Sequence, residues 1–354
     1  MSADTIVEVR RQVEICNACR YCEGYCSVFP AITRRRSFSD ADITQLANLC
    51  HNCRGCYYAC QFTAPHEFDL NIPKVLAELR QETWQENAVP QPLARAFHAS
   101  GVAIALATIV GFALLIWAIK ALGSQGGEGF YAVLSHNAMV MVFMPAFILP
   151  LIAIAVSVKR YWNSIGGGAI EFQDLMAAFC SASRMRDLSG GHGEGCNFED
   201  EDRFSSERRW NHQLVMYGFL LCFGATSVAT IMHYVFDLPA PYPLLSIPKL
   251  LGVTGGIALC IGTVGLAVLK TMADRNQSDA RVWGGEMAFV LLLFVVSLSG
   301  LALYALGAST WMPGLLAFHL GAVLAFFLLM PYSKMVHGFY RLAALVADAR
   351  DKRS

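Results

Sequence analysis

Two runs of cysteines carry the most distinctive chemistry in this sequence. In each run, pairs of residues separate the first three cysteines, and a fourth cysteine follows after three further residues. The first run contains Cys16, Cys19, Cys22 and Cys26, and the second contains Cys50, Cys53, Cys56 and Cys60. This spacing is typical of proteins that bind two 4Fe-4S clusters, in which the fourth cysteine of a run ligates the other cluster.

The crossing pattern predicts which cysteines share a cluster. We expect one cluster to be ligated by Cys16, Cys19, Cys22 and Cys60, and the other by Cys50, Cys53, Cys56 and Cys26. Two zinc sites and a disulfide scaffold are the alternatives. Zinc sites rarely use four cysteines at this spacing twice over, and thiols stay reduced in the cytoplasm, where we expect this domain to lie. The pattern therefore favours two iron–sulfur clusters.

The composition divides the chain into a polar part and an apolar part. Of the 354 residues, 55% are hydrophobic and only 15% are charged, whereas about 25% are charged in an average soluble protein. Residues 1–96 are polar and rich in cysteine, and most of the sequence after them is apolar. A small peripheral domain fused to a membrane domain is therefore predicted. The net charge of zero gives no reason to expect nucleic acid as a partner.

Six apolar segments of about 20 residues are long enough to cross a bilayer as helices. They are residues 97–119, 137–158, 214–236, 250–269, 287–306 and 315–332. The chain is therefore expected to be embedded in a lipid bilayer.

Lys and Arg residues gather beside one set of span ends. They are Arg95, Lys159, Arg160, Arg208, Arg209, Lys270, Arg275, Arg281, Lys334 and Arg341. The opposite loops contain only Lys120 and Lys249. Because short cytoplasmic loops carry the excess of positive charge, we expect both termini and the cysteine domain on the cytoplasmic side of a bacterial inner membrane. The N-terminal residues are charged and do not resemble a signal peptide.

The chain is predicted to be all-α, with a helical two-cluster ferredoxin-like domain fused to a six-helix transmembrane bundle. Ser39 and Asp42 indicate a helix start, and residues 71–86 also have a helical pattern, whereas strand signals are scarce. Residues 88–92 read as a short, stiff linker. The expected parts are the cluster domain (1–90), two spans (91–158), a cytoplasmic connection (159–211), four spans with haem sites (212–340) and a charged tail (341–354).

The connection contains an amphipathic segment, residues 170–185, which could lie along the membrane interface or against the cluster domain. A glycine-rich stretch (190–196) and an acidic run (199–202) follow. A flexible connector and a docking segment are both open interpretations of them. The remaining cysteines are expected to be free thiols in the connection (Cys180 and Cys196) or packed within spans (Cys222 and Cys260).

Four histidines have matching positions in two spans. His212 and His233 lie near the two ends of the third span, and His319 and His337 near the two ends of the sixth. Their separations correspond to about 31 and 27 Å of helix, close to the thickness of the hydrocarbon core. Antiparallel packing would place His212 opposite His337 and His233 opposite His319. Facing imidazoles are suitable axial ligands for one or two b-type haems, although interfacial histidines without a ligand are the alternative.

The functional roles of four other histidines and of two charged residues are less strongly indicated by the sequence. His98 and His136 lie at the ends of the first two spans and are substitute haem ligands, whereas His51 and His66 are expected to pack beside a cluster or tune it. Glu286 and Lys334 are candidates for supplying protons to a quinone, with anchoring at lipid headgroups as the alternative.

The segment from His319 to His337, with the sequence Pro-Tyr-Ser-Lys-Met-Val-His at its end, resembles the last haem-binding helix of the nitrate reductase gamma subunit family. In that family, two histidines at this spacing ligate two different b haems. The third span departs from the family, which places its two histidines closer together.

Nearly the whole chain resembles the tricarballylate/citrate utilisation protein B family (TcuB/CitB). The similarity covers both cysteine runs, residues 193–196, residues 208–210 and residues 217–223. It implies a membrane electron carrier with iron–sulfur clusters and haem. It also implies that the carrier reoxidises a flavoprotein dehydrogenase for tricarballylate or a related tricarboxylate and feeds electrons to the respiratory chain.

The sequence contains no nucleophile elbow, phosphate loop or recognisable flavin fingerprint. We therefore expect substrate oxidation on a separate FAD-dependent dehydrogenase, and membrane quinone as the final acceptor. The same parts could run in reverse, as a quinol-oxidising subunit that supplies a cytoplasmic reductase. An iron–sulfur redox sensor is a further alternative, but no output domain follows His337. A transporter is disfavoured because no pair of broken-helix repeats is present.

Overall fold

The computed structural model describes residues 2–122, 129–188, 190, 195, 204–238 and 240–353. Most of the glycine-rich stretch and all of the acidic run lie outside these residues.

The described residues form helices and no β-strand, as predicted. The α-helices are α1 (Ala3–Cys19), α2 (Val28–Thr33), α3 (Asp40–Leu49), α4 (Gly55–Tyr58), α5 (Ile72–Asn87), α6 (Gln91–Leu122), α7 (His136–Ser164), α8 (Phe172–Arg184), α9 (Glu207–Phe236), α10 (Ile247–Met272), α11 (Trp283–Leu306), α12 (Met312–Leu329) and α13 (Val336–Arg353). The 3-10 helices are η1 (Gly129–Ala132), η2 (Arg186–Leu188), η3 (Arg275–Gln277) and η4 (Ala280–Val282).

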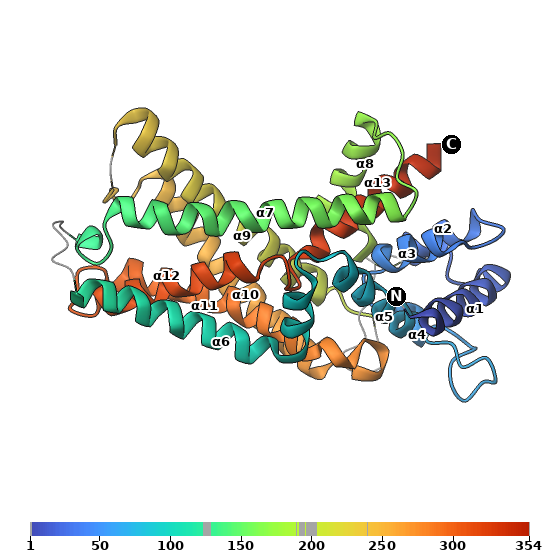
Figure 1. Ribbon diagram of the computed structural model, residues 1–354. Helices are drawn as coiled ribbons and strands as arrows, with labels where there is room; N and C mark the ends of the chain where they lie inside the picture. The colour runs from blue at the N-terminus through green and yellow to red at the C-terminus, as the bar shows by residue number, and fades with distance from the viewer. Residues whose placement is uncertain are drawn as a thin grey trace.

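The cysteine domain is a cluster of short helices at one end of the molecule (Figure 1). Helix α3 begins as predicted, because the Ser39 hydroxyl accepts the backbone N–H of Asp42 and the Asp42 carboxylate accepts the N–H of Ser39. Helix α5 likewise matches the predicted helix. Apolar residues three or four positions apart bury one face of α1, α3 and α5. They include Val9, Val13, Ile43, Leu46, Leu76 and Leu79.

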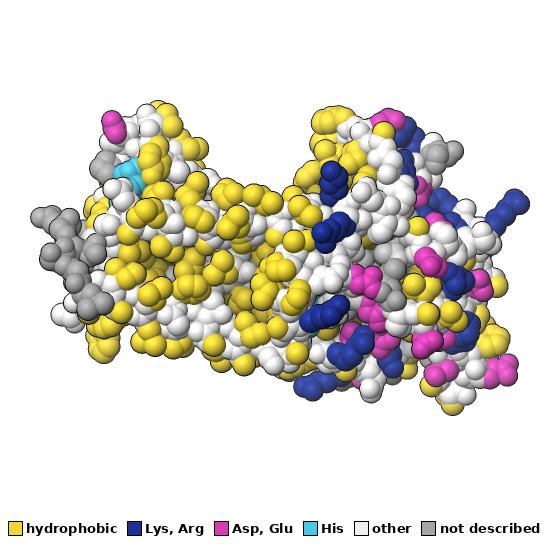
Figure 2. All heavy atoms as spheres, viewed as in Figure 1, with side chains coloured by type: hydrophobic (Ala, Val, Ile, Leu, Met, Phe, Trp, Pro, Cys, Tyr) yellow, Lys and Arg dark blue, Asp and Glu magenta, His cyan; other side chains and the backbone are white. Residues whose placement is uncertain are grey.

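Among the described residues, six helices are long and apolar enough to cross a membrane, which confirms the six predicted spans. Helices α9 and α10 form a close hairpin in which a Cβ on Gly218 would lie only 2.8 Å from the Gly255 carbonyl oxygen. Helix α12 packs closely on α6, where a Cβ on Gly321 would lie 2.8 Å from the carbonyl oxygen of Ile109. Figure 2 shows an apolar surface over the spans, with Lys and Arg at its boundary and over the cysteine domain. This distribution indicates a multi-pass membrane protein.

The sixth span differs from the prediction at its end nearest the cysteine domain. Helix α12 ends at Leu329, residues 330–335 form turns, and a separate helix, α13, begins at Val336. Pro331 lacks a backbone N–H and its ring crowds the preceding turn, which disfavours continuation of the helix. The prediction that His319 and His337 lie on one continuous helix was therefore wrong, and the charged tail is the C-terminal part of α13.

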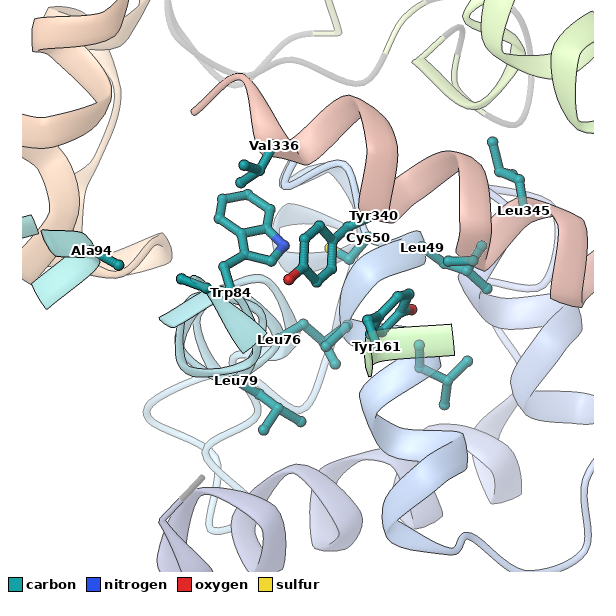
Figure 3. Packing of buried hydrophobic residues seen from close by; sticks show 14 of the residues in the cluster. Leu49, Cys50, Leu76, Leu79, Trp84, Ala94, Tyr161, Val336, Tyr340 and Leu345 are labelled. Carbon is teal, nitrogen blue, oxygen red and sulfur yellow. The ribbon is translucent and has the colours of Figure 1, made fainter. Parts of the chain in front are cut away.

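Helix α13 joins the cysteine domain to the spans. Tyr340 is 1% exposed, and its hydroxyl lies 2.5 Å from the Ser157 hydroxyl of α7. Figure 3 shows Tyr340 packed among Trp84 of α5, Tyr161 of α7 and Leu49 of α3. Arg35 also binds Asp351 of α13, with an N–O distance of 2.9 Å. One continuous core therefore holds the two parts together.

The amphipathic segment of the connection forms α8, as predicted. Its apolar side chains, which include Phe172, Met176 and Phe179, are exposed. On its other face Asp174 is buried and binds Arg353 of α13 with an N–O distance of 3.1 Å. Helix α8 thus packs on α13 (Figure 1), and its apolar face is left uncovered.

Candidate functional site

The first three cysteines lie together with the last cysteine of the second run. Helix α1 ends at Cys19 and the chain turns through Arg20, whose φ of 56° is left-handed, toward Cys22. Burial, and after it the neighbouring thiols of Cys22, Cys60 and Cys19, raises the pKa of Cys16 to about 12. We call Cys16, Cys19, Cys22 and Cys60 the distal cysteine set.

The other four cysteines form a second group. Burial, and then the thiols of Cys53 and Cys50, raises the pKa of Cys26 well above its usual value. Burial and the thiols of Cys53, Cys26 and Cys50 do the same for Cys56. All four line one pocket, together with His51 and apolar side chains such as Ile72. We call Cys26, Cys50, Cys53 and Cys56 the proximal cysteine set.

The grouping matches the crossing pattern that the cysteine spacing predicts. None of these eight cysteines forms a disulfide bond within the part of the chain that the structure describes. Within the part of the chain that the structure describes, no three Cys, His, Asp or Glu side chains lie close enough together to hold a single metal ion.

Backbone amides and arginines surround the proximal set. The N–H of Asn52 donates to the Cys50 sulfur at 3.3 Å; in the distal set, the N–H of Phe62 donates to the Cys60 sulfur at 3.4 Å. The Cys50 carbonyl accepts from Arg80 of α5 at 2.7 Å and from Arg341 of α13 at 2.5 Å. The second run is therefore fixed by helices from outside the cysteine motif.

A third arginine links this run to a membrane span. Arg208, in the first turn of α9, donates to the Asn52 carbonyl at 2.6 Å and to the His51 carbonyl at 3.3 Å. Because α9 also carries His212 in its second turn, the proximal set lies next to the inner end of this span. Sequence reasoning missed the roles of Arg80, Arg208 and Arg341, since no local pattern marks a side chain that binds a distant carbonyl.

His212 and His337 face each other, as predicted, although His337 belongs to α13. Their ring centroids are 5.7 Å apart and their planes are inclined at 75°. The Nδ1 atom of His337 lies 2.5 Å from the Lys334 carbonyl oxygen. Because a carbonyl can only accept, Nδ1 carries the proton and Nε2 is left with a lone pair that can ligate a metal. Burial lowers the pKa of His337 well below its usual value, which keeps the ring neutral.

The outer histidines do not form the predicted pair. The His233 ring lies 4.5 Å from His136 of α7, with the planes inclined at only 30°. His319 instead lies against α11, where its Nδ1 is 2.9 Å from the Ser299 hydroxyl. The prediction of a His233–His319 pair was wrong, because α9 packs along α10 while α12 packs between α6 and α11.

A group of charged side chains lies near the membrane boundary. The Glu286 carboxylate pairs with Lys270 at 2.5 Å and with Lys334. Burial lowers the pKa of Lys334 to about 7, while Glu286 acts in the opposite direction. Close by, the Nε2 atom of His98 lies 2.6 Å from the Gln81 amide nitrogen. Glu286 is therefore held by two lysines within the protein and does not anchor the chain at headgroups.

The remaining histidines and cysteines singled out in the sequence lie outside these groups. His66 packs between Phe62 and Phe68, and its Nδ1 accepts the Phe68 N–H at 3.1 Å. Cys180 is exposed and free, as expected. Cys260 contacts the Ser297 hydroxyl at 3.2 Å between α10 and α11. His51 is half-buried beside the proximal set, and Cys196 lies outside the described residues.

Comparison with known proteins covers both halves of the chain. A family model described as Citrate utilization protein B matches residues 88–354, and one described as Citrate utilization protein B Fer4-like domain matches residues 9–86. The chain is 43% identical, over 353 residues, to the Citrate utilization protein B of Escherichia coli, a match that covers 98% of this chain and 92% of that protein. No solved structure matches. The Fer4-like match spans both cysteine runs and indicates an iron–sulfur electron-transfer role.

Proposed function

Because this chain belongs to the citrate utilization protein B family, we propose that it reoxidises a cytoplasmic FAD-dependent dehydrogenase and passes the electrons to membrane quinone. The dehydrogenase acts on tricarballylate or a related tricarboxylate such as citrate. The chain is the electron-transfer component of this system and not the subunit that oxidises the carbon substrate. It lies in a bacterial inner membrane with both termini in the cytoplasm.

The observation that carries the proposal is a series of three candidate sites across the molecule. The distal set is the outermost, and its Cys19 is exposed. The proximal set follows, held by arginines of α5, α9 and α13. The His212–His337 pair comes last, at the inner end of the spans. This order suits the stepwise transfer of single electrons from a soluble donor into the membrane.

The residues present fit the groups that this function requires. Each cysteine set supplies four thiols for one 4Fe-4S cluster. His212 and His337, whose ring centroids lie 5.7 Å apart, would be the residues that hold a b-type haem. The Nδ1 atoms of His51 and His212 and the Nε atom of Arg341 are buried without a partner, so this region can accommodate a further polar group. When bound, the clusters and the haem supply the one-electron chemistry that amino-acid side chains lack.

The protein's own side chains position and insulate these groups. The Lys334 carbonyl orients His337, and the amides of Asn52 and Phe62 donate to cysteine sulfurs, which stabilises negative charge there. The core around Trp84 and Tyr340 keeps water away from the junction. The group of Glu286, Lys270 and Lys334 lies at the inner side of the spans and provides protons for quinone reduction.

The test is anaerobic reduction of the purified protein by the candidate flavoprotein with tricarballylate or citrate. We expect about eight iron atoms and eight sulfides per chain, four for each cluster, and a reduced b-haem spectrum. Cys22→Ala should abolish haem reduction by the flavoprotein but not by dithionite, whereas Cys180→Ala, which removes an exposed thiol outside both sets, should change neither. Absence of both sulfide and Soret absorption would contradict the proposal.

A further inference from the structure

Three arginines from three different helices converge on the backbone of residues 50–52. Arg80 and Arg341 donate to the same carbonyl oxygen, that of Cys50, and Arg208 donates to the next two carbonyls. Arg80 is only 5% exposed. Burial, and then the nearby charges of Arg80 and Arg208, lowers the pKa of Arg341 to about 10, so the guanidinium still carries its charge at neutral pH.

Among the residues that the structure describes, few negative charges offset this group. Asp187 is the carboxylate whose charge acts on Arg341. Asp348 of α13 is already paired with Arg34 and Lys352, and Glu286 is paired with two lysines. The surroundings of the proximal set are therefore positive, with the Cys50 thiol close enough to act on Arg341.

The distal set has no comparable arrangement among the residues that the structure describes. Arg20 donates its Nε to the Asn17 carbonyl at 3.0 Å, but the residue is exposed. Arg11 is paired with Glu8 at 2.6 Å, so its charge is offset. Solvent screens such exposed charges much more strongly than buried ones.

We propose that Arg80 and Arg341, supported by Arg208, raise the reduction potential of the cluster in the proximal set above that of the cluster in the distal set. The inference rests on the proposed function, because it presumes that both clusters are bound. A cluster gains one negative charge on reduction, and a buried cation stabilises that charge. One electron leaves the distal cluster, which is oxidised, and reduces the proximal cluster, with no atom or proton exchanged.

The three arginines are thus positioning residues that bias each electron toward the membrane. They act through the Cys50–Asn52 backbone and through charge. The same contacts hold the second cysteine run next to the helix that carries His212. A donor protein can therefore deliver electrons at the exposed end, while the reduced state accumulates beside the His212–His337 pair.

The test is a redox titration of the full chain, followed by electron paramagnetic resonance, in Arg341→Gln and Arg341→Lys. The signal that disappears in Cys19→Ala identifies the distal step. We expect Arg341→Gln to lower the equilibrium constant for proximal reduction about tenfold, which is 59 mV for a one-electron couple. Arg341→Lys, which keeps the charge, should stay close to the unmodified protein. Arg20→Gln, near the distal set, is the matched control and should leave the proximal step unchanged.

If an Arg341 variant loses iron and its reduction potential cannot be measured, Arg80→Gln and Arg80→Lys provide a second comparison of a neutral with a charged side chain. Loss of the proximal cluster in both Gln variants but in neither Lys variant would also support the role of charge. Equal potentials in all four variants and the unmodified protein would overturn the inference, as would equal damage by Gln and Lys. If the unmodified protein contained neither cluster, the proposed function itself would be contradicted.

Discussion

The two cysteine runs have the same internal spacing but very different surroundings. The distal set lies at the end of the molecule farthest from the spans, where Cys19 and the neighbouring Tyr21 are exposed. The proximal set lies in a pocket beneath α5, and Cys50 is bound by arginines of α5 and α13. Spacing alone would make the two sites equivalent.

The difference shows how one local motif can serve two tasks. Ligand spacing determines which type of cluster a run can hold, whereas burial and neighbouring charge determine its potential and its access to partners. We infer that the distal set, whose Cys19 is exposed, receives electrons and that the proximal set passes them to the membrane.

Removal of one thiol from each set should have unequal consequences. We expect Cys19→Ala to lose about four iron atoms per chain and keep a folded domain, because its side chain lies at the surface. Cys56→Ala should lose more iron and unfold more readily, since this thiol lies within the domain. Iron analysis and thermal unfolding in detergent measure both effects. Equal losses in the two variants would show that the sets are equivalent.

Replacement of a histidine beside the proximal set should remove a haem signal. His337→Ala should abolish the inner b-haem spectrum, because it removes one of the two facing imidazoles. His233→Ala is the matched control, since His233 packs against His136 and not against this pair. Optical spectra of dithionite-reduced protein provide the measurement. An unchanged spectrum in His337→Ala would move the ligand assignment to another histidine.

Removal of Trp84, which packs where the cysteine domain meets the spans, should destabilise the fold around the proximal set. Trp84 is 5% exposed, and its indole N–H donates to Asn48 at 2.9 Å. Trp84→Ala should therefore reduce the unfolding free energy by about 3–5 kcal/mol. Trp311, which is 73% exposed, is the control, and Trp311→Ala should have little effect. Urea titration in detergent compares the two. Similar losses would indicate that the junction is not a stabilising core.

The smallest expected effect concerns the start of α3, the helix that leads to Cys50. Burial raises the pKa of Asp42, but hydrogen bonds from Ser39 and Arg35 outweigh it and hold that pKa below its usual value. The capping interaction therefore stabilises the fold above about pH 4 and is lost as the pH falls through the lowered pKa. Asp42→Asn should cost about 1 kcal/mol at pH 7.

The pH dependence of this effect provides the check. Unfolding of the unmodified protein and of Asp42→Asn should be compared at pH 7 and at pH 3. The difference between them should shrink at the lower pH. A difference that is independent of pH would mean that the carboxylate charge does not support α3.

Much of the architecture could be predicted because it depends on local patterns. The six spans follow from runs of apolar residues, and the cap of α3 follows from Ser39 and Asp42. The break before α13 was missed, because proline is tolerated within membrane helices and Pro331 alone did not show that the helix would end there. The His212–His337 pair was found even so, since both residues lie at the inner ends of their segments.

The contacts of His233, His319 and the three arginines could not be predicted from the spacing of residues in the sequence. Whether His233 meets His319 or His136 is decided by which helices pack side by side, and several packing orders satisfy the same apolar pattern. The contact from Arg341 to Cys50 spans 291 residues of sequence, and that from Arg208 to Asn52 spans 156. No periodic pattern reports contacts over such separations.

The sequence by itself determined the number of spans, the two groups of four cysteines and the membership of the family, because these properties reside in residue type and short spacing. Only the tertiary structure decided that Cys19 of one set is exposed while the other set lies next to three arginines and two facing imidazoles. The physical reason is that burial and electrostatic environment are properties of the whole packed core, to which α5, α9 and α13 contribute side chains from distant parts of the chain.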